Sequence, residues 1–85
     1  MARNELVHSL LRAMDVLELV GQADRGMTLA EVCSGLDMKP STVHNILRTL
    51  AARDYLERTT SPVRFRLGSA VFRLGDELHL SLIPI

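Results

Sequence analysis

Four polar side chains stand close together in one segment that has helical periodicity: Ser41, Thr42, Asn45 and Arg48. An asparagine amide can form two hydrogen bonds to adenine, and an arginine guanidinium can do the same with guanine. The hydroxyls of Ser41 and Thr42 suit phosphate oxygens, because the N-terminal end of a helix favours anions. These residue types predict a surface that binds double-stranded DNA. An ordinary solvent-exposed helix face has the same composition, so the neighbouring elements are needed to distinguish between these two interpretations.

The charge distribution favours the DNA interpretation, although the total does not. The net charge is zero, yet residues 39–73 hold seven basic and two acidic residues, against three and six in residues 1–38. Such a distribution predicts a local positive face. Five further side chains are candidates for DNA contact: Lys39, His44, Arg64, Arg66 and Thr28.

These candidates differ in the contact we expect. Arg64 and Arg66 suit phosphates or a minor groove, although charged residues also protect exposed strand edges. Thr28 is first a helix cap and second a phosphate contact. His44 borders the polar set, so it either contacts DNA or is a surface residue without a contact.

Other chemistries find no support in the sequence. His8, His44 and His79 are far apart and lack cysteine or histidine partners at ligand spacing, so we expect no metal. Cys33 is the single cysteine, which excludes an internal disulfide and suits a reducing cytoplasm. We find no phosphate-binding glycine loop and no nucleophile–base pair, and therefore expect neither an enzyme nor a cofactor. No apolar run approaches the ~18–20 residues of a membrane span.

The polar set lies in a predicted helix over residues 40–53. Pro40 suits the first helical position, where its missing N–H has no acceptor. Four apolar residues follow the i, i+3, i+4, i+7 pattern of a buried stripe: Val43, Ile46, Leu47 and Leu50. Their burial would turn the polar set outward.

Three more elements are predicted around this helix. A helix over 28–36 begins with a capping box of Thr28 and Glu31 and turns four residues inward: Leu29, Val32, Cys33 and Leu36. A hairpin over 55–67 alternates Val63, Phe65 and Leu67 with Arg64 and Arg66. Residues 69–82 predict a linker helix. A left-handed turn is expected at Asp54, since aspartate tolerates that conformation.

The first predicted helix, over residues 6–21, has an unusually broad apolar surface. Ten of the fifteen residues from 6 to 20 are apolar, whereas an amphipathic helix needs an apolar arc of only about 100°. We therefore expect a homodimer through residues 6–20. Gly21 is a candidate C-terminal stop.

Together these elements predict a winged helix-turn-helix, mainly α with a small β-hairpin: a three-helix core, a two-stranded wing and a C-terminal linker helix. The 85 residues suit a single domain over 1–85. In this fold the helix over 40–53 would enter the major groove and the basic wing would lie on the flanking backbone.

The sequence also resembles the isocitrate-lyase-regulator (IclR) family of bacterial transcription factors, over roughly residues 9–76. The resemblance is carried by the stretches Leu10-Leu11-Arg12-Ala13-Met14-Asp15-Val16-Leu17, Met27-Thr28-Leu29-Ala30-Glu31-Val32, Ser41-Thr42-Val43-His44-Asn45-Ile46-Leu47, and Arg66-Leu67-Gly68 with Leu74-Gly75. Asn45 stands where the family usually has arginine, and Asp54 where it usually has glycine.

The resemblance implies the DNA-binding domain of a bacterial transcription regulator. The homodimer expected through residues 6–20 would read a pseudo-palindromic operator, because a two-fold protein matches a two-fold site. The resemblance also implies an effector-binding C-terminal domain that this chain lacks, so we expect either a fragment or a short stand-alone protein. The alternative function is a winged-helix module that binds proteins only. The neutral total charge and the apolar terminal helices favour that alternative, whereas the polar helix and the arginine wing favour DNA.

Overall fold

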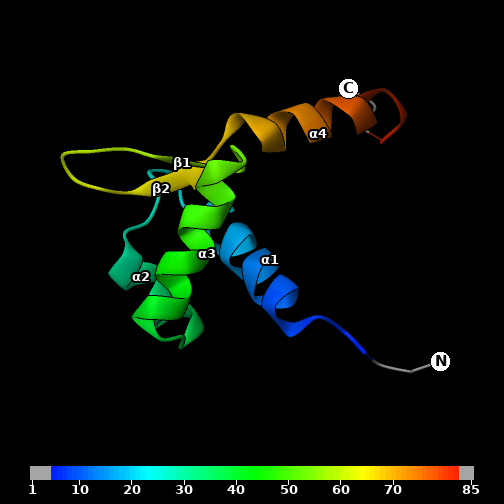
Figure 1. Cartoon of the computed structure of the whole chain (residues 1–85). Helices are drawn as coiled ribbons and strands as arrows, with labels where there is room; N and C mark the ends of the chain where they lie inside the picture. The colour runs from blue at the N-terminus through cyan, green and yellow to red at the C-terminus, as the bar shows by residue number, and fades with distance from the viewer. Residues whose placement is uncertain (1–4, 83–85) are drawn as a thin grey trace.

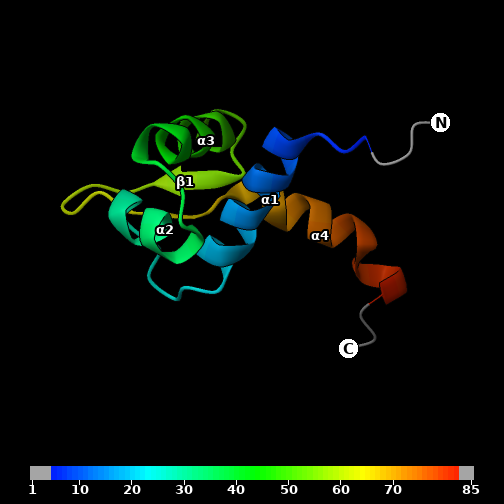
Figure 2. The ribbon, with the colours of Figure 1, turned by 90° about the horizontal axis from the view of Figure 1, so that it is seen from below.

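The computed structural model describes residues 5–82, with side chains as far as Glu77. The elements are α1 (His8–Gly21), α2 (Leu29–Leu36), α3 (Pro40–Ala52), β1 (Leu56–Arg58), β2 (Phe65–Leu67) and α4 (Ser69–Leu82). Helices α1, α2 and α3 pack together beside the hairpin, and α4 extends away from them (Figures 1 and 2). Four helices with a two-stranded antiparallel hairpin confirm the predicted fold class.

The capping box forms as predicted and fixes the start of α2. The Thr28 hydroxyl accepts a hydrogen bond from the Glu31 amide at 3.2 Å, and a Glu31 carboxylate oxygen accepts one from the Thr28 amide at 3.0 Å. Helix α2 ends at Leu36, and the capping residue that follows, Asp37, is left-handed with a φ of 54°. The short turn that follows places Pro40 at the start of α3, also as predicted.

The core lies where the three helices meet the hairpin, and its fully or nearly buried residues come from every element of that group: Val16, Val20, Val32, Val43, Leu47, Leu56 and Phe65. The inward faces predicted for α2 and α3 are confirmed. Leu29, Cys33, Leu36, Ile46 and Leu50 pack against the same core but stay partly exposed.

Helix α1 begins two residues later than expected, at His8 instead of residue 6. Leu6 and Val7 are about three-fifths exposed, at 63% and 61%, so no packing extends the helix to them. Val7 also supplies no side-chain hydrogen bond as the N-cap. At the other end α1 stops at Gly21 without a left-handed residue; the left-handed glycine of this region is Gly26, with a φ of 80°.

The wing has shorter strands than the hairpin predicted over 55–67. The register pairs Leu56 with Leu67 and Arg58 with Phe65. Val63 was expected beside Phe65 on the core face, but it lies in the loop before β2 and is 41% exposed. The alternation therefore fails at the turn, where Ser61 has a φ of 57°. Asp54 takes the predicted left-handed conformation, with a φ of 68°.

Candidate nucleic-acid interface

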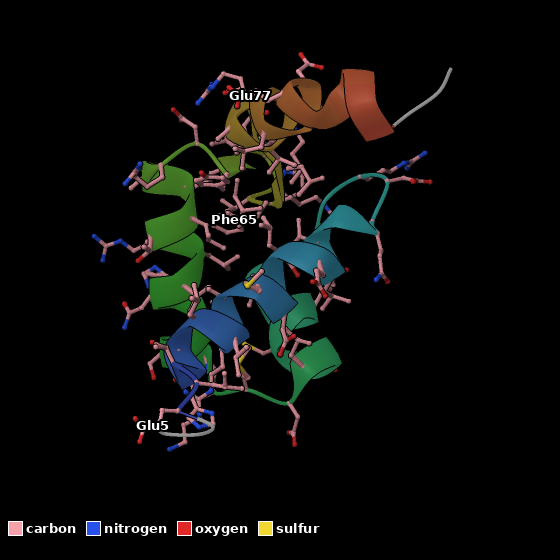
Figure 3. All side chains as sticks on the ribbon, turned by 90° about the vertical axis from the view of Figure 1, so that its right-hand side faces the viewer. Glu5, Phe65 and Glu77 are labelled. Carbon is pink, nitrogen blue, oxygen red and sulfur yellow. The ribbon has the colours of Figure 1, made fainter. Side chains whose placement is uncertain are left out.

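The exposed face of α3 carries the predicted polar residues. Val43 and Leu47 are completely buried and so fix the rotation of the helix about its axis. Ser41, Asn45 and Arg48 then form an exposed stripe at i, i+4 and i+7. Figure 3 shows α3 at the edge of the molecule, with side chains that point away from α1 and α2. An exposed helix face with hydrogen-bonding side chains is what a major groove accepts.

Thr42 and His44 lie at the margins of this stripe. Thr42 is half-buried and lines a surface hollow together with Arg12 of α1. His44 is exposed. The Thr49 hydroxyl donates a hydrogen bond to the backbone carbonyl of Asn45 at 2.7 Å. This hydrogen bond does not involve the Asn45 side-chain amide.

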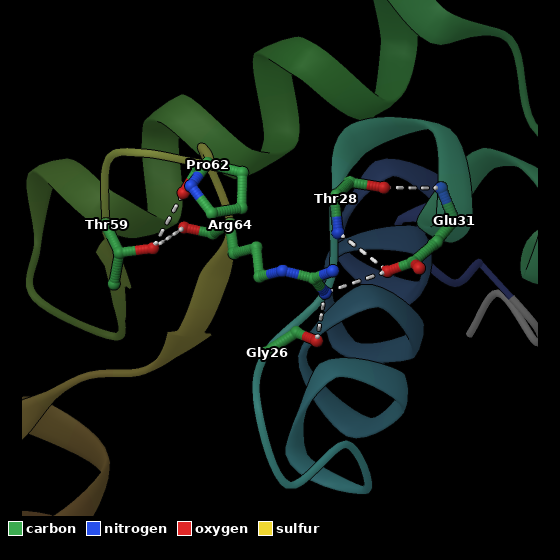
Figure 4. A network of polar contacts seen from close by, with 6 residues as sticks. All are labelled: Gly26, Thr28, Glu31, Thr59, Pro62 and Arg64. Atoms are coloured by element: carbon green, nitrogen blue, oxygen red, sulfur yellow. Dashed lines mark hydrogen bonds and ion pairs between the residues drawn. The ribbon is translucent and has the colours of Figure 1, made fainter.

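The wing arginines have different surroundings. The Arg64 guanidinium is directed at α2: Nη1 donates to the Gly26 carbonyl at 3.3 Å and to the Glu31 carboxylate at 3.4 Å (Figure 4). Arg66 points outward and pairs with Glu57 across the hairpin at 3.0 Å, with both side chains more than half exposed. Of these two arginines, Arg66 is the more open to an approaching polyanion.

Arg64 belongs to a larger set of contacts that fasten the wing to α2. The Met27 and Phe65 backbones exchange two hydrogen bonds of 2.8 Å. The Glu31 carboxylate accepts a hydrogen bond from Arg64 and also caps α2, so this one side chain joins the wing to α2. Thr28 uses its hydroxyl and its amide in the same cap and is half-buried. The predicted role of Thr28 as a helix cap is therefore confirmed.

Arg12 and Arg58 were not identified from the sequence as candidates for DNA contact, although both are exposed near the interface. Arg12 was counted with the broad apolar helix, and Arg58 with the strand. Neither is in an ion pair among the described side chains, and the same holds for Lys39. The sequence contained one signal for Arg12. This arginine lies among the polar residues of the first helix and is the only arginine or lysine between residues 6 and 20.

Within the part of the chain whose side chains are described, no three histidine, cysteine, aspartate or glutamate residues gather in a way that could hold a metal ion. His79 lies outside those side chains. Over the described helices, none has the length and apolar character needed to cross a membrane.

Comparisons with known proteins give the chain its family. The IclR helix-turn-helix domain matches residues 9–60. The HTH-type transcriptional regulator BhcR of Paracoccus denitrificans is 42% identical over 70 residues, which are 82% of this chain and 25% of that protein. The chain thus spans about a quarter of this relative's length.

Solved structures show the same fold. An IclR-family transcriptional regulator from Brucella abortus superimposes on 98% of this chain and 32% of its own, with a TM-score of 0.81 at 20% identity. The repressor BlcR of Agrobacterium tumefaciens covers 89% of this chain and 30% of its own, with a TM-score of 0.75 at 29% identity. The order of elements, the outward polar face of α3 and these similarities agree: the chain belongs to the IclR helix-turn-helix domain family of transcriptional regulators.

Proposed function

We propose that this chain binds double-stranded DNA in a sequence-specific manner, with α3 in the major groove and the wing on the flanking backbone. The observation that carries the proposal is the exposed stripe of Ser41, Asn45 and Arg48 on α3. Asn45 and Arg48 are three residues apart, so their side chains can reach neighbouring base steps. Thr42, His44 and Lys39 border the stripe and suit the sugar–phosphate backbone.

We also propose that two copies bind together through α1. The first turns of α1 and the residues before it leave five large apolar side chains exposed: Leu6, Val7, Leu10, Leu11 and Met14. A second copy would cover them, and a two-fold dimer reads a pseudo-palindromic site. An effector, if one regulates the protein, would bind to a domain outside these 85 residues.

Binding to another protein without DNA is the second candidate function. Phe72 and Leu74 of α4 are exposed as well as the start of α1, and such apolar surface is typical of protein contacts. Selection of bound sequences from a random DNA pool separates the two functions. DNA binding predicts a two-fold symmetric motif, whereas the protein-binding alternative predicts no enriched motif.

Variants of α3 test which bases are read. Arg48→Ala should weaken binding to the selected motif by ~1–3 kcal/mol and relax selectivity at one position. Asn45→Ala should do so at a different position. Binding to random DNA should change little for either variant. Titration of the selected motif and of single-base variants measures these effects.

Arg25→Ala is the matched control for Arg48→Ala. Arg25 is exposed in the loop after α1, which lies on the opposite side of the molecule from α3 in Figure 3. Its removal should leave the motif unchanged. An intact motif and affinity in both α3 variants, with a native circular dichroism spectrum, would show that α3 does not read bases.

The wing arginines should respond differently to substitution. Arg66→Ala removes an exposed cation, so the slope of log K against log salt should become shallower by about one ion. Arg64→Ala should leave that slope nearly unchanged, because the Arg64 side chain is less exposed than that of Arg66 and its guanidinium is directed at Gly26 and Glu31. Titrations of the same DNA between about 50 and 200 mM salt compare the two slopes. A loss of one ion in Arg64→Ala would instead place Arg64 on the DNA backbone.

A further inference from the structure

A polar hollow lies between α1, the turn after α2 and the first turn of α3. Its volume is about 320 Å³, and five residues line it: Arg12, Asp37, Met38, Lys39 and Thr42. Arg12 comes from α1, Lys39 from the residue before α3, and Thr42 from α3 itself. Side chains from separate parts of the sequence thus converge on one place.

The hollow has a positive balance of charge. Arg12 and Lys39 are exposed, and no described carboxylate forms an ion pair with either. Asp37 is the one acidic residue in the lining. Its left-handed backbone ends α2, and aspartate accepts that conformation readily. Two cations and one carboxylate leave a net positive site that is open to solvent.

The hollow flanks α3 on the side away from the wing. Ala51 lies beside Leu56 and Arg58 of the wing, whereas Thr42 lies beside Arg12. These two residues of α3 are nine positions apart, which is two and a half turns, so they occupy opposite sides of the helix. A major groove about 12 Å wide brings phosphates near both flanks of an inserted helix. The wing would serve one flank and the hollow the other.

We propose that this hollow binds a phosphate of the DNA backbone, with Arg12 as the principal contact and with Lys39 and Thr42 beside it. The inference rests on the proposed DNA binding and adds α1 to the interface. Arg12 would donate hydrogen bonds from its guanidinium to the phosphate oxygens. Asp37 opposes the phosphate electrostatically and thereby lowers the affinity of the site.

Two charge changes of opposite sign test this site in the full chain. Arg12→Gln should weaken binding about tenfold near 0.1 M salt and make the salt slope shallower by about one ion, equally for the selected motif and for random DNA. Arg12→Lys keeps the charge and should retain the slope. Asp37→Asn should tighten binding, by roughly two- to fivefold, because asparagine keeps the left-handed conformation and removes the repulsion.

The loop after α1 supplies matched controls. Arg25→Gln and Asp24→Asn make the same charge changes at exposed positions near the other end of α1. Both should leave the slope and the affinity as they are. Lys39→Gln is a second probe of the hollow in case Arg12→Gln disturbs folding, and circular dichroism reports on the fold of each variant.

The outcomes separate the hollow from the proposed function. If the unmodified chain selects a motif but Arg12→Gln and Lys39→Gln keep its salt slope, the hollow does not bind phosphate and the DNA-binding function stands. Equal effects of the hollow and loop variants would likewise overturn the site, because only overall charge would then matter. A chain that binds no DNA at all overturns both.

Discussion

Replacement of Leu47 by alanine is expected to lower the free energy of unfolding by about 3–5 kcal/mol. Leu47 is completely buried and belongs to the largest fully buried side chains of the core. It lies on α3 among residues from α1, α2 and the hairpin, so truncation leaves a cavity that no single element can fill by moving. A chain of this size has a total stability of only roughly 4–13 kcal/mol, so this loss removes a large share of it and at the low end of that range unfolds the chain.

Urea denaturation followed by circular dichroism measures this loss. Leu74→Ala is the control, because Leu74 is about half exposed on α4 and its truncation should cost well under 1 kcal/mol. A loss below about 1 kcal/mol for Leu47→Ala would mean that the core collapses around the cavity. DNA binding by Leu47→Ala should fail in proportion to the unfolded fraction, unlike the effect of Arg48→Ala, which leaves the fold native.

The sequence predicted the apolar stripe of α3 but not which of its residues is most deeply buried. Periodicity placed Ile46 and Leu47 equally on the buried side of α3. In the structure Ile46 is only partly buried, because it lines an apolar groove against Leu10 and Ala13 of α1. The way α1 crosses α3 determines how deeply Ile46 is buried. The periodicity of a single helix contains no information about that crossing.

The wing shows the same limit for polar residues. Alternation predicted that Arg64 and Arg66 share an outward face, and Arg66 does point outward. Arg64 meets Glu31 because the Met27–Phe65 pairing brings the start of α2 beside β2. That contact joins residues 33 positions apart in the chain. Local pattern predicted the elements and the exposed face of α3, whereas contacts between distant elements set the environment of each arginine.

The start of α1 could not be predicted from the pattern for a related reason. The polar–apolar pattern continues through Leu6 and Val7, but helix formation there needs packing or a cap, and neither is present. The capping box at Thr28, in contrast, is a local interaction between residues three apart. It was predictable because its two hydrogen bonds depend on the sequence of a single turn.

Replacement of Gly68 by alanine is expected to destabilise the fold by about 3 kcal/mol. A Cβ at this position would meet backbone atoms of two residues: the Asp54 carbonyl oxygen, the Asp54 carbonyl carbon at 2.9 Å and the Leu56 carbonyl carbon at 3.0 Å. Main-chain atoms cannot rotate away as a flexible side chain can. Gly68 therefore permits a close approach between the end of the wing and the turn after α3.

Two hydrogen bonds depend on this approach, so the strain should spread. The Gly68 amide donates to the Tyr55 carbonyl at 2.9 Å, and the Ala70 amide donates to the Asp54 carbonyl at 2.9 Å. These bonds attach the start of α4 to the turn at Asp54. Displacement of Gly68 would stretch both, and the loss of wing position should also weaken DNA binding through Arg66.

Gly75→Ala provides a control with the same added methyl group. Gly75 lies within α4, and a Cβ there meets nothing within 4 Å. Alanine favours helix over glycine, so this variant should gain about 0.5–1 kcal/mol of stability. Thermal or urea unfolding of the two variants should thus give changes of opposite sign. Equal small changes in both would mean that the turn at Asp54 yields to the methyl group and that the close approach at Gly68 is not required for the wing.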